Sequence, residues 1–340
     1  MKSSAANVHQ LDDGIPPESV IFGSTPAMAA IRESLLKVAD TNIPVLIEGE
    51  SGTGKEIICK YIHQLSIWAD GPFVKVNCPA IPGTLVESEL FGYEKGAFTG
   101  AFGAKPGRVE MAHCGTLFLD EISELDLPLQ SKLLQLLQDG QFSRIGASAE
   151  TKVDVRVVCA TNRQLQREVT NGRFRQDLYY RITGLILRLP PLRERIGDIS
   201  MLAEYLIGLH SGRYKREVPP LSTSTLMLMK THPWPGNVRE LENLMKRYVV
   251  LGTEDVITKE LNWRTTSHID LEVAPEGSIA LSQVTREAVK DLESKIILST
   301  LQANQWNRKR AARALHISYR SLLYKLKRAG IQSRRDMQAD

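Results

Sequence analysis

Residues Val45–Lys55, with the sequence VLIEGESGTGK, decide the fold of this chain. Gly49–Lys55 fits the pattern G-x-x-x-x-G-K, follows an apolar run and precedes the helical run Ile57–Gln64. In that strand–loop–helix setting, glycines let backbone N–H groups surround a phosphate, and the dipole of the following helix favours the bound charge. The pattern therefore predicts a loop that binds a nucleoside triphosphate, ATP with Mg²⁺. The predicted binding residues are Gly49, Glu50, Ser51, Gly52, Thr53, Gly54, Lys55 and Glu56.

One position of this loop departs from the usual pattern. The residue after Lys55 is Glu56, where a Ser or Thr that binds Mg²⁺ usually stands. The apolar run Gly115–Asp120 ends in two carboxylates, Asp120 and Glu121, which offer the missing groups. We expect Asp120 to bind the metal and Glu121 to polarise the water that attacks the γ-phosphate. Such a pair is also compatible with a plain surface position, but the phosphate loop favours the catalytic interpretation.

The first 190 residues alternate short apolar runs with helical segments, which is the pattern of a parallel α/β sheet. The predicted strands are Ile43–Glu48, Pro72–Asn77, Gly115–Asp120, Val153–Ala160 and Leu185–Leu189, and a core-facing helix is predicted at Ser131–Leu137. Beyond Pro191 only helical patterns follow, at Asp198–Leu209, Ser222–Thr231 and Asn237–Leu251. The chain is thus divided into a flexible lead (1–20), an α/β core (21–190), a helical unit (191–252), a linker (253–280) and a basic helical domain (281–335).

Composition excludes several other classes of protein. The chain has 340 residues, and none of its apolar stretches approaches the roughly 20 residues of a membrane-spanning helix. The first residues lack the apolar core of a signal peptide. The four cysteines are widely spaced without a CxxC pair, so we expect buried, reduced thiols. The sequence predicts a cytoplasmic protein with no membrane partner.

Charge is distributed unevenly along the chain. Residues 277–340 contain 13 Lys and Arg against 5 Asp and Glu, a net charge of +8, whereas residues 1–276 carry −4. A basic tail on a mildly acidic body indicates a polyanion as the partner of the tail. Charge alone would also fit a basic helix that is merely solvated.

Helical patterns in the tail predict a helix-turn-helix. Asn307–Leu315 is the first predicted helix, Ser318 is the predicted N-cap of the second, and Gly330 is expected to end it. The expected buried stripe of the second helix is Tyr319, Leu322, Leu323 and Leu326. The predicted DNA-binding residues are Arg308, Tyr319, Arg320, Ser321, Tyr324, Lys325 and Lys327. A generic helical hairpin is the alternative.

The most specific motif is Gly96–Ala101, GAFTGA, which follows Glu89–Glu94. An aromatic and a β-branched hydroxyl between glycines predict a flexible, exposed tip; the alternative is a tight turn with Phe98 in a core. The segment resembles the loop of the bacterial enhancer-binding proteins, the AAA+ activators of sigma-54 RNA polymerase, and the resemblance covers roughly residues 20–335. It implies a loop that moves with the nucleotide state and presses Phe98 and Thr99 on the sigma factor. The implied contact residues are Gly96, Ala97, Phe98, Thr99, Gly100 and Ala101.

The same resemblance implies a fold and further site residues. The implied fold is an AAA+ P-loop NTPase, a parallel sheet flanked by helices, with an all-helical lid and a C-terminal Fis-like helix-turn-helix domain. A glutamate at position 56 is usual in this family. The residues carried over are Asn77, which holds the catalytic glutamate, Asn162, which senses the γ-phosphate, Arg175 and Arg181, which face a neighbouring subunit's nucleotide, and Arg239, which reaches the nucleotide from the lid. Tyr319 stands where Fis-like relatives often carry a polar base reader.

The function implied by the resemblance is ATP-driven activation of transcription. Such a protein binds upstream enhancer DNA, assembles as a homo-oligomer from a dimer to a hexameric ring, and remodels the closed complex of the sigma-54 RNA polymerase holoenzyme into an open one. Two alternatives stay open: a DNA-binding regulator of the housekeeping polymerase, and an AAA+ motor or loader that processes DNA. The family commonly carries an N-terminal receiver or sensory domain, for which 20 residues are too few. Regulation by a protein in trans, regulation by abundance and a chain cut from a longer one all fit.

Overall fold

The structure, a computed structural model, describes residues 15–81, 83–267, 297, 300–301 and 306–328. The chain consists of two compact units, Met1–Trp263 and Arg264–Asp340. The first unit contains a sheet with helices on both faces and a helical lid, and the second contains a helical pair.

A five-stranded parallel sheet, in the order β2-β5-β8-β1-β9, forms the centre of the first unit as described. Its strands are β1 (Val45–Glu48), β2 (Phe73–Asn77), β5 (Gly115–Asp120), β8 (Val155–Thr161) and β9 (Leu185–Arg188). Their apolar side chains are largely buried on both faces, as expected of parallel strands covered by helices. β8 pairs with both β1 and β5, so the carboxyl ends of these three strands lie side by side. The five predicted strands and their parallel arrangement are confirmed.

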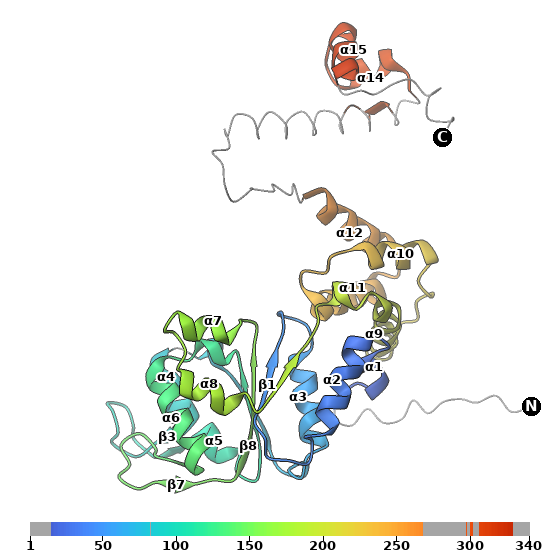
Figure 1. Cartoon of the computed structure of the whole chain (residues 1–340). Coiled ribbons are helices and arrows are strands. Elements are labelled where there is room, and N and C mark those ends of the chain that lie inside the picture. Colours follow the sequence, from blue (N-terminus) through green and yellow to red (C-terminus); the bar gives the residue numbers. More distant parts are fainter. Residues whose placement is uncertain (1–14, 82, 268–296, 298–299, 302–305, 329–340) are drawn as a thin grey trace, which may run out of the picture. The chain divides into compact units, whose positions relative to one another are not determined.

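Apolar clusters hold helices against both faces of the sheet (Figure 1). On one face lie α1 (Glu18–Phe22), α2 (Pro26–Leu36) and α3 (Lys55–Gln64), and on the other lie α4 (Gly83–Phe91), α5 (Arg108–Met111), α6 (Leu127–Asp139), α7 (Leu165–Thr170) and α8 (Gln176–Ile182). α6 contains the predicted helix, and the carboxylate of its N-cap Asp126 accepts the Leu129 N–H at 3.0 Å. Short antiparallel hairpins are formed by β3 (Gly92–Tyr93) with β4 (Lys105–Pro106) and by β6 (Gln141–Phe142) with β7 (Thr151–Lys152).

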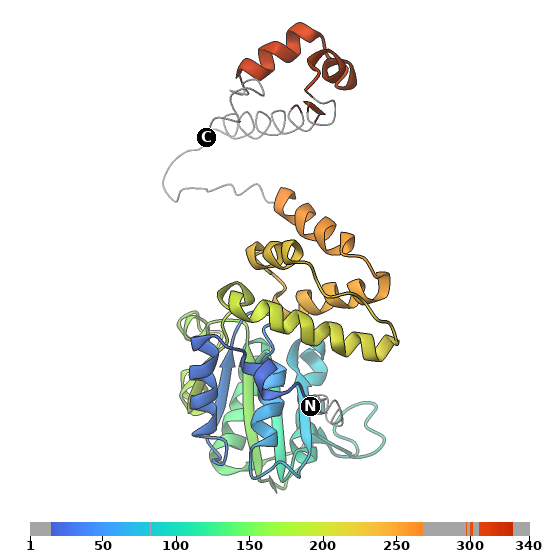
Figure 2. The same cartoon turned by 90° about the vertical axis from the view of Figure 1, so that its right-hand side faces the viewer.

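The lid follows the last strand and stacks above the sheet in Figure 2. It consists of α9 (Ile199–Tyr214), α10 (Thr223–Thr231), α11 (Asn237–Leu251) and α12 (Asp255–Ser267). Its core surrounds the buried Trp234, whose indole N–H donates to the Met229 carbonyl at 2.8 Å. The expected linker from residue 253 is corrected here, because Ile257 and Leu261 lie one helical turn apart on α12 and are buried in this core. Among the side chains that the structure describes on α12, these two are the buried ones, so the apolar period in the sequence is weak.

The second unit contains a helix-turn-helix, α14 (Arg308–Ala314) and α15 (Tyr319–Arg328). The predicted cap is confirmed, since the hydroxyl of Ser318 accepts the Ser321 N–H at 3.1 Å. Leu322 and Leu326 are buried in one cluster with the alanines of α14. The expected buried stripe is wrong at Tyr319, which is 43% exposed, and Leu323 is only half-buried. Tyr319 is the first residue of α15 and lies one turn before the part of the helix that packs on α14, while Gly330 lies outside the described residues.

The cysteines agree with the sequence expectation at three positions. Cys59, Cys78 and Cys159 are buried, and burial raises the pKa of the Cys78 thiol to about 12. Cys114 is exposed, which corrects the expectation for that residue. It precedes β5 in a left-handed conformation with φ 55°, and its N–H donates to the Asp154 carbonyl, which fixes a tight turn there. Within the described residues, no helix is both long and apolar enough to cross a membrane.

Candidate functional site

The loop after β1 has the backbone that the sequence predicts for phosphate binding. Gly52 and Gly54 have φ of +81° and +100°, and a Cβ at Gly52 would collide with the Gly236 carbonyl of the lid. Lys55 begins α3 and is only 7% exposed. Its ammonium donates to the Gly49 carbonyl at 2.9 Å and lies 3.3 Å from Oε1 of Glu121. The buried charge is therefore balanced by the loop and by the neighbouring strand end.

Two carboxylates stand at the end of β5, beside this loop. Glu121 has a left-handed φ of 57°, and its Oε2 accepts the backbone N–H of Asn162 at 2.8 Å. This bond comes from the residue after β8 and fixes the carboxylate at the sheet edge. Burial raises the pKa of Asp120, and the ammonium groups of Lys75 and Lys55 oppose that rise. Asp120 and Glu121 thus have different surroundings although they are adjacent.

Glu56, the unusual residue of the loop, is held by two lysines. Its carboxylate lies 3.0 Å from the ammonium of Lys60 and 2.6 Å from that of Lys75. Burial raises the pKa of Glu56, but the hydrogen bonds from these lysines outweigh it and the net shift is downward. The carboxylate is therefore charged near neutral pH and is an ion-pair partner in this structure.

Lid residues contact the phosphate loop directly. Arg239 of α11 donates from Nη1 to the Ser51 hydroxyl at 2.9 Å, so the predicted lid arginine does lie at the loop. Asn237 donates to Oε2 of Glu50 at 3.1 Å, and Arg193 makes two hydrogen bonds to the same carboxylate, at 2.9 and 2.7 Å. Together these groups join the lid to the loop. Neither Asn237 nor Arg193 is among the site residues predicted from the sequence.

A polar pocket of about 300 Å³ lies between the loop and the lid. Its lining includes Lys55, Glu56, Lys75, Asp120, Glu121 and Arg239. An apolar pocket of about 240 Å³ adjoins it and shares Gly54, Ile57, Val238 and Glu242 with it. A polyanion with a flat apolar group attached would fit this pair of pockets.

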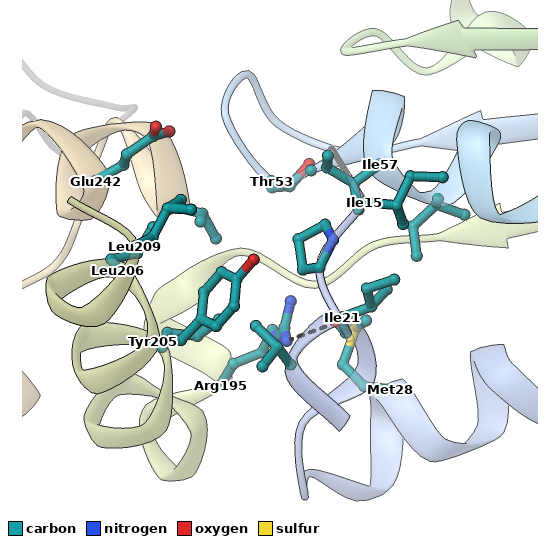
Figure 3. Close-up of a pocket in the computed structure, with 16 residues that line it drawn as sticks. Ile15, Ile21, Met28, Thr53, Ile57, Arg195, Tyr205, Leu206, Leu209 and Glu242 are labelled. Carbon is teal, nitrogen blue, oxygen red and sulfur yellow. Dashed lines mark hydrogen bonds between the residues drawn. The ribbon is translucent and has the colours of Figure 1, made fainter. Parts of the chain in front are cut away.

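The walls of the apolar pocket come from distant parts of the sequence (Figure 3). Ile15, Ile21 and Met28 stand on one side, and Tyr205 and Leu206 of α9 stand on the other. These residues have the ordinary pattern of core positions, so no local signal identifies them as lining a site.

Asp198 fixes the N-terminal wall of this pocket to the lid. Its carboxylate is 0% exposed and accepts the Ser24 N–H at 2.8 Å and the Thr25 hydroxyl at 3.0 Å. Arg195, three residues earlier, donates to the same carboxylate at 3.0 Å and to the Ile21 carbonyl at 3.3 Å. We call these five residues the Asp198 latch.

Three of the predicted catalytic residues lie apart from these pockets. Asn77 is exposed, and no hydrogen bond between its side chain and Glu121 is present among the described residues. Arg175 donates to the Asp177 carboxylate and Arg181 to the Leu137 carbonyl, and neither lines the polar or the apolar pocket. Asn162 approaches the site through its backbone N–H.

The predicted contact loop extends from the β3–β4 hairpin. Within it the Gly96 N–H donates to the Ala101 carbonyl at 2.9 Å, and the Phe98 ring centroid lies 4.9 Å from that of Tyr93. Phe98 is nevertheless 44% exposed, which is against the alternative of a core-buried ring, and Thr99 is also exposed. At its base, Arg144 makes ion pairs with Glu94 at 2.9 Å and Glu110 at 2.6 Å. The base is thus held by side chains, and the tip by its backbone.

The predicted DNA-binding residues are distributed along α14 and α15. Tyr319, Arg320 and Tyr324 are exposed, and the remaining described ones, Arg308, Ser321 and Lys325, are half-buried. The side chain of Lys327 lies outside the described residues. Arg320 and Tyr324 thus lie on an exposed face of the second helix, the helix that helix-turn-helix proteins place in the major groove.

Comparison with known families gives three matches along the chain. Residues 21–188 match the Sigma-54 interaction domain, residues 193–263 the AAA+ ATPase lid domain, and residues 288–328 the Bacterial regulatory protein, Fis family. The lid match ends close to Leu261, the last described core residue of α12.

Regulatory proteins of several bacteria are similar over most of the chain. Regulatory protein AtoC of Escherichia coli K12 is 43% identical over 336 residues, which are 97% of this chain and 72% of that protein. The Nif-specific regulatory protein of Azotobacter vinelandii is 43% identical over 94% of this chain, which spans 60% of that relative. The crystal structure of NtrX from Brucella abortus in complex with ATP is similar in fold, with a TM-score of 0.65 and 31% sequence identity. The match covers 91% of this chain and 69% of that one.

Proposed function

The chain belongs to the family of sigma-54-dependent transcriptional activators, and from that premise we propose that it uses ATP hydrolysis to open sigma-54 RNA polymerase complexes at promoters. In this proposal the second unit binds upstream enhancer DNA, and the first unit hydrolyses ATP and acts on the polymerase. The chain spans 60 to 72% of the length of the two regulators compared above, so the activity of the whole protein is part of the proposal.

The paired pockets support ATP as the nucleotide. The apolar pocket would take the base, with the Tyr205 ring and Ile57 on either side, and the polar pocket would take the triphosphate. Lys55 would exchange its contacts with the Gly49 carbonyl and Glu121 for the β- and γ-phosphates. Arg239 would reach the same phosphates from the lid.

The donor groups at the strand ends fit Mg²⁺ as the metal. Among the described residues, no cluster of three or more His, Cys, Asp or Glu side chains could hold a metal alone. Mg²⁺ is commonly held by one or two carboxylates together with substrate phosphates, and Asp120 offers such a carboxylate in the polar pocket. The bound ion would neutralise charge on the phosphates.

Hydrolysis would be carried by Glu121. Its carboxylate accepts a hydrogen bond from the Asn162 N–H on one oxygen and lies 3.3 Å from Lys55 on the other. When Lys55 moves to the phosphates, that second oxygen becomes available to orient a water for attack. Asn162, at the end of β8, would sense the γ-phosphate. Asn77, at the end of β2, would hold Glu121 in another nucleotide state of the hydrolysis cycle.

A ring of subunits would complete the site. Arg175 and Arg181 line neither the polar nor the apolar pocket, which supports their delivery to a neighbouring subunit's nucleotide. A planar guanidinium there stabilises charge on the transferred phosphoryl group. The exposed tip with Phe98 and Thr99 would then contact the sigma factor and follow the nucleotide state.

The convergence of Lys55, Glu121 and Arg239 on one pocket beside an apolar one is the observation that carries this proposal. Open-complex formation should be measured on a sigma-54 promoter with purified protein, holoenzyme and ATP. We expect stimulation that depends on ATP and on an upstream binding site. Equal activity without a sigma-54 holoenzyme, or no stimulation over a wide range of protein concentration, would reject it.

A further inference from the structure

We propose that Lys75 sets the divalent-cation requirement of this site by competing with the metal for Asp120. Lys75 lies on β2 and lines the polar pocket, although it belongs to none of the motifs described above. Its ammonium lies 2.6 Å from Oε2 of Glu56 and 3.7 Å from Oδ2 of Asp120. The inference rests on the proposed function, because it concerns the same nucleotide site.

The pocket brings negative groups together that need a compensating cation. Glu56, Asp120 and Glu121 all line it, and a bound triphosphate would add further negative charge. Lys55 is already engaged by Glu121 and the loop carbonyls. Among the described residues, Lys75 is the cation that makes an ion pair with Asp120.

Lys60 provides an internal comparison. It contacts Oε1 of Glu56 at 3.0 Å, whereas Lys75 contacts Oε2 of the same carboxylate. Lys60 does not line the polar pocket and has no ion pair with Asp120 among the described residues. The two lysines therefore share Glu56 and differ in their relation to Asp120.

The position of Lys75 has two opposite consequences. Before a metal binds, its charge reduces the repulsion between the carboxylates and the phosphates, so it favours nucleotide binding without metal. Mg²⁺ must take the Asp120 oxygen away from the Lys75 ammonium, so the same charge raises the metal concentration that the site requires. After Mg²⁺ has displaced Lys75 from Asp120, the ion pair with Glu56 would keep the Lys75 ammonium at the edge of the pocket.

The test compares nucleotide binding by the full chain and by Lys75→Gln. The probe is the methylanthraniloyl derivative of adenylyl imidodiphosphate, which is not hydrolysed, and binding is followed by fluorescence polarisation. We expect Lys75→Gln to bind the probe about two- to fivefold more weakly in EDTA, and to reach half-saturation at a two- to fivefold lower MgCl₂ concentration. This is the size expected of a partly exposed ion pair. Lys75→Arg should stay close to wild type.

Lys60→Gln is the matched control and should leave the MgCl₂ curve unchanged. Weaker binding of Lys75→Gln by the same factor with and without Mg²⁺ would overturn the proposal, because Lys75 would then be a plain phosphate contact. A shift of equal size in Lys60→Gln would also overturn it, since the effect would then arise from Glu56 alone. If the wild-type chain does not bind the probe in MgCl₂, the proposed function itself fails, which is a separate outcome.

Discussion

The nucleotide pocket and the GAFTGA loop are held in different ways. In the pocket, Glu121 is held by the Lys55 ammonium and by the backbone N–H of Asn162. In the loop beside the pocket, Glu50 is held by the side chains of Arg193 and Asn237. At the loop tip, backbone hydrogen bonds close the turn while Phe98 remains 44% exposed. The groups of the pocket are therefore fixed by polar contacts, whereas a side chain proposed to meet a partner is left exposed at the loop tip.

Glu121→Gln should give the largest effect, a loss of ATP hydrolysis, and it changes the nucleotide pocket without changing the loop. The amide keeps the shape of the side chain but cannot accept a proton, so ATP hydrolysis should fall about 10²- to 10⁴-fold. Probe binding should stay within about threefold of wild type, since the groups proposed to bind the phosphates are unchanged. Steady-state phosphate release and fluorescence polarisation measure the two quantities.

Glu124→Gln is the control for this change. Glu124 follows three residues later and pairs with Arg163 at 2.6 Å, outside the polar pocket. Its hydrolysis rate should stay near that of wild type. Comparable losses in both variants would show that the effect is structural and that Glu121 is not the general base.

Asp198→Asn should lower stability, which tests whether the pocket wall is held as firmly as its contacts indicate. The change leaves the buried Arg195 guanidinium without its carboxylate, and removing one partner of a buried pair typically costs about 3–5 kcal/mol. Urea unfolding measures the free energy. The exposed pair of Glu33 with Lys37 gives the control, because solvent screens it and Glu33→Gln should change the free energy of unfolding far less than Asp198→Asn does.

The effect of Asp198→Asn should also depend on pH. Burial raises the pKa of Asp198, but hydrogen bonds from Ser24, Arg195 and Thr25 outweigh it, so the folded-state pKa is lowered. A lowered carboxyl pKa contributes stability above the unfolded-state pKa, and that contribution is lost as the pH falls through the folded-state value. The difference between wild type and variant should therefore shrink in acid. A difference that stays constant down to the lowest pH would contradict an ionic latch.

Much of the pocket could be predicted from the sequence because its residues follow strand ends. The glycines before Lys55 and the carboxylates after Gly115–Leu119 lie next to the apolar runs that place them, so local patterns suffice. Parallel strands then bring these ends together without further information. The helix-turn-helix could also be predicted locally, because alanines and leucines at helical spacing mark its packed face.

What the sequence did not predict depends on contacts between distant segments. The apolar pocket joins residues near Ile21 to Tyr205 of α9, and the Asp198 latch joins the same two regions. Lys75 looks like any exposed strand lysine until β2 is placed beside β5. The helix α12 was not predicted for a related reason, because Ile257 and Leu261 are buried by the distant lid residues that pack on them.

Phe98→Ala is the smallest of these effects in free energy and tests the loop side of the comparison. An aromatic anchor at the centre of an interface typically contributes about 2 kcal/mol or more, so open-complex formation should fall by roughly thirtyfold. ATP hydrolysis should be unchanged, because Phe98 contacts Tyr93 and no group of the pocket. Phe102→Ala is the matched variant, because Phe102 is 91% exposed and lies just beyond the motif. This variant should lose much less open-complex formation than Phe98→Ala. Equal losses of open-complex formation in both variants would mean that the loop acts as a general apolar patch. A loss of ATP hydrolysis in Phe98→Ala would show that the loop and the nucleotide pocket are energetically coupled.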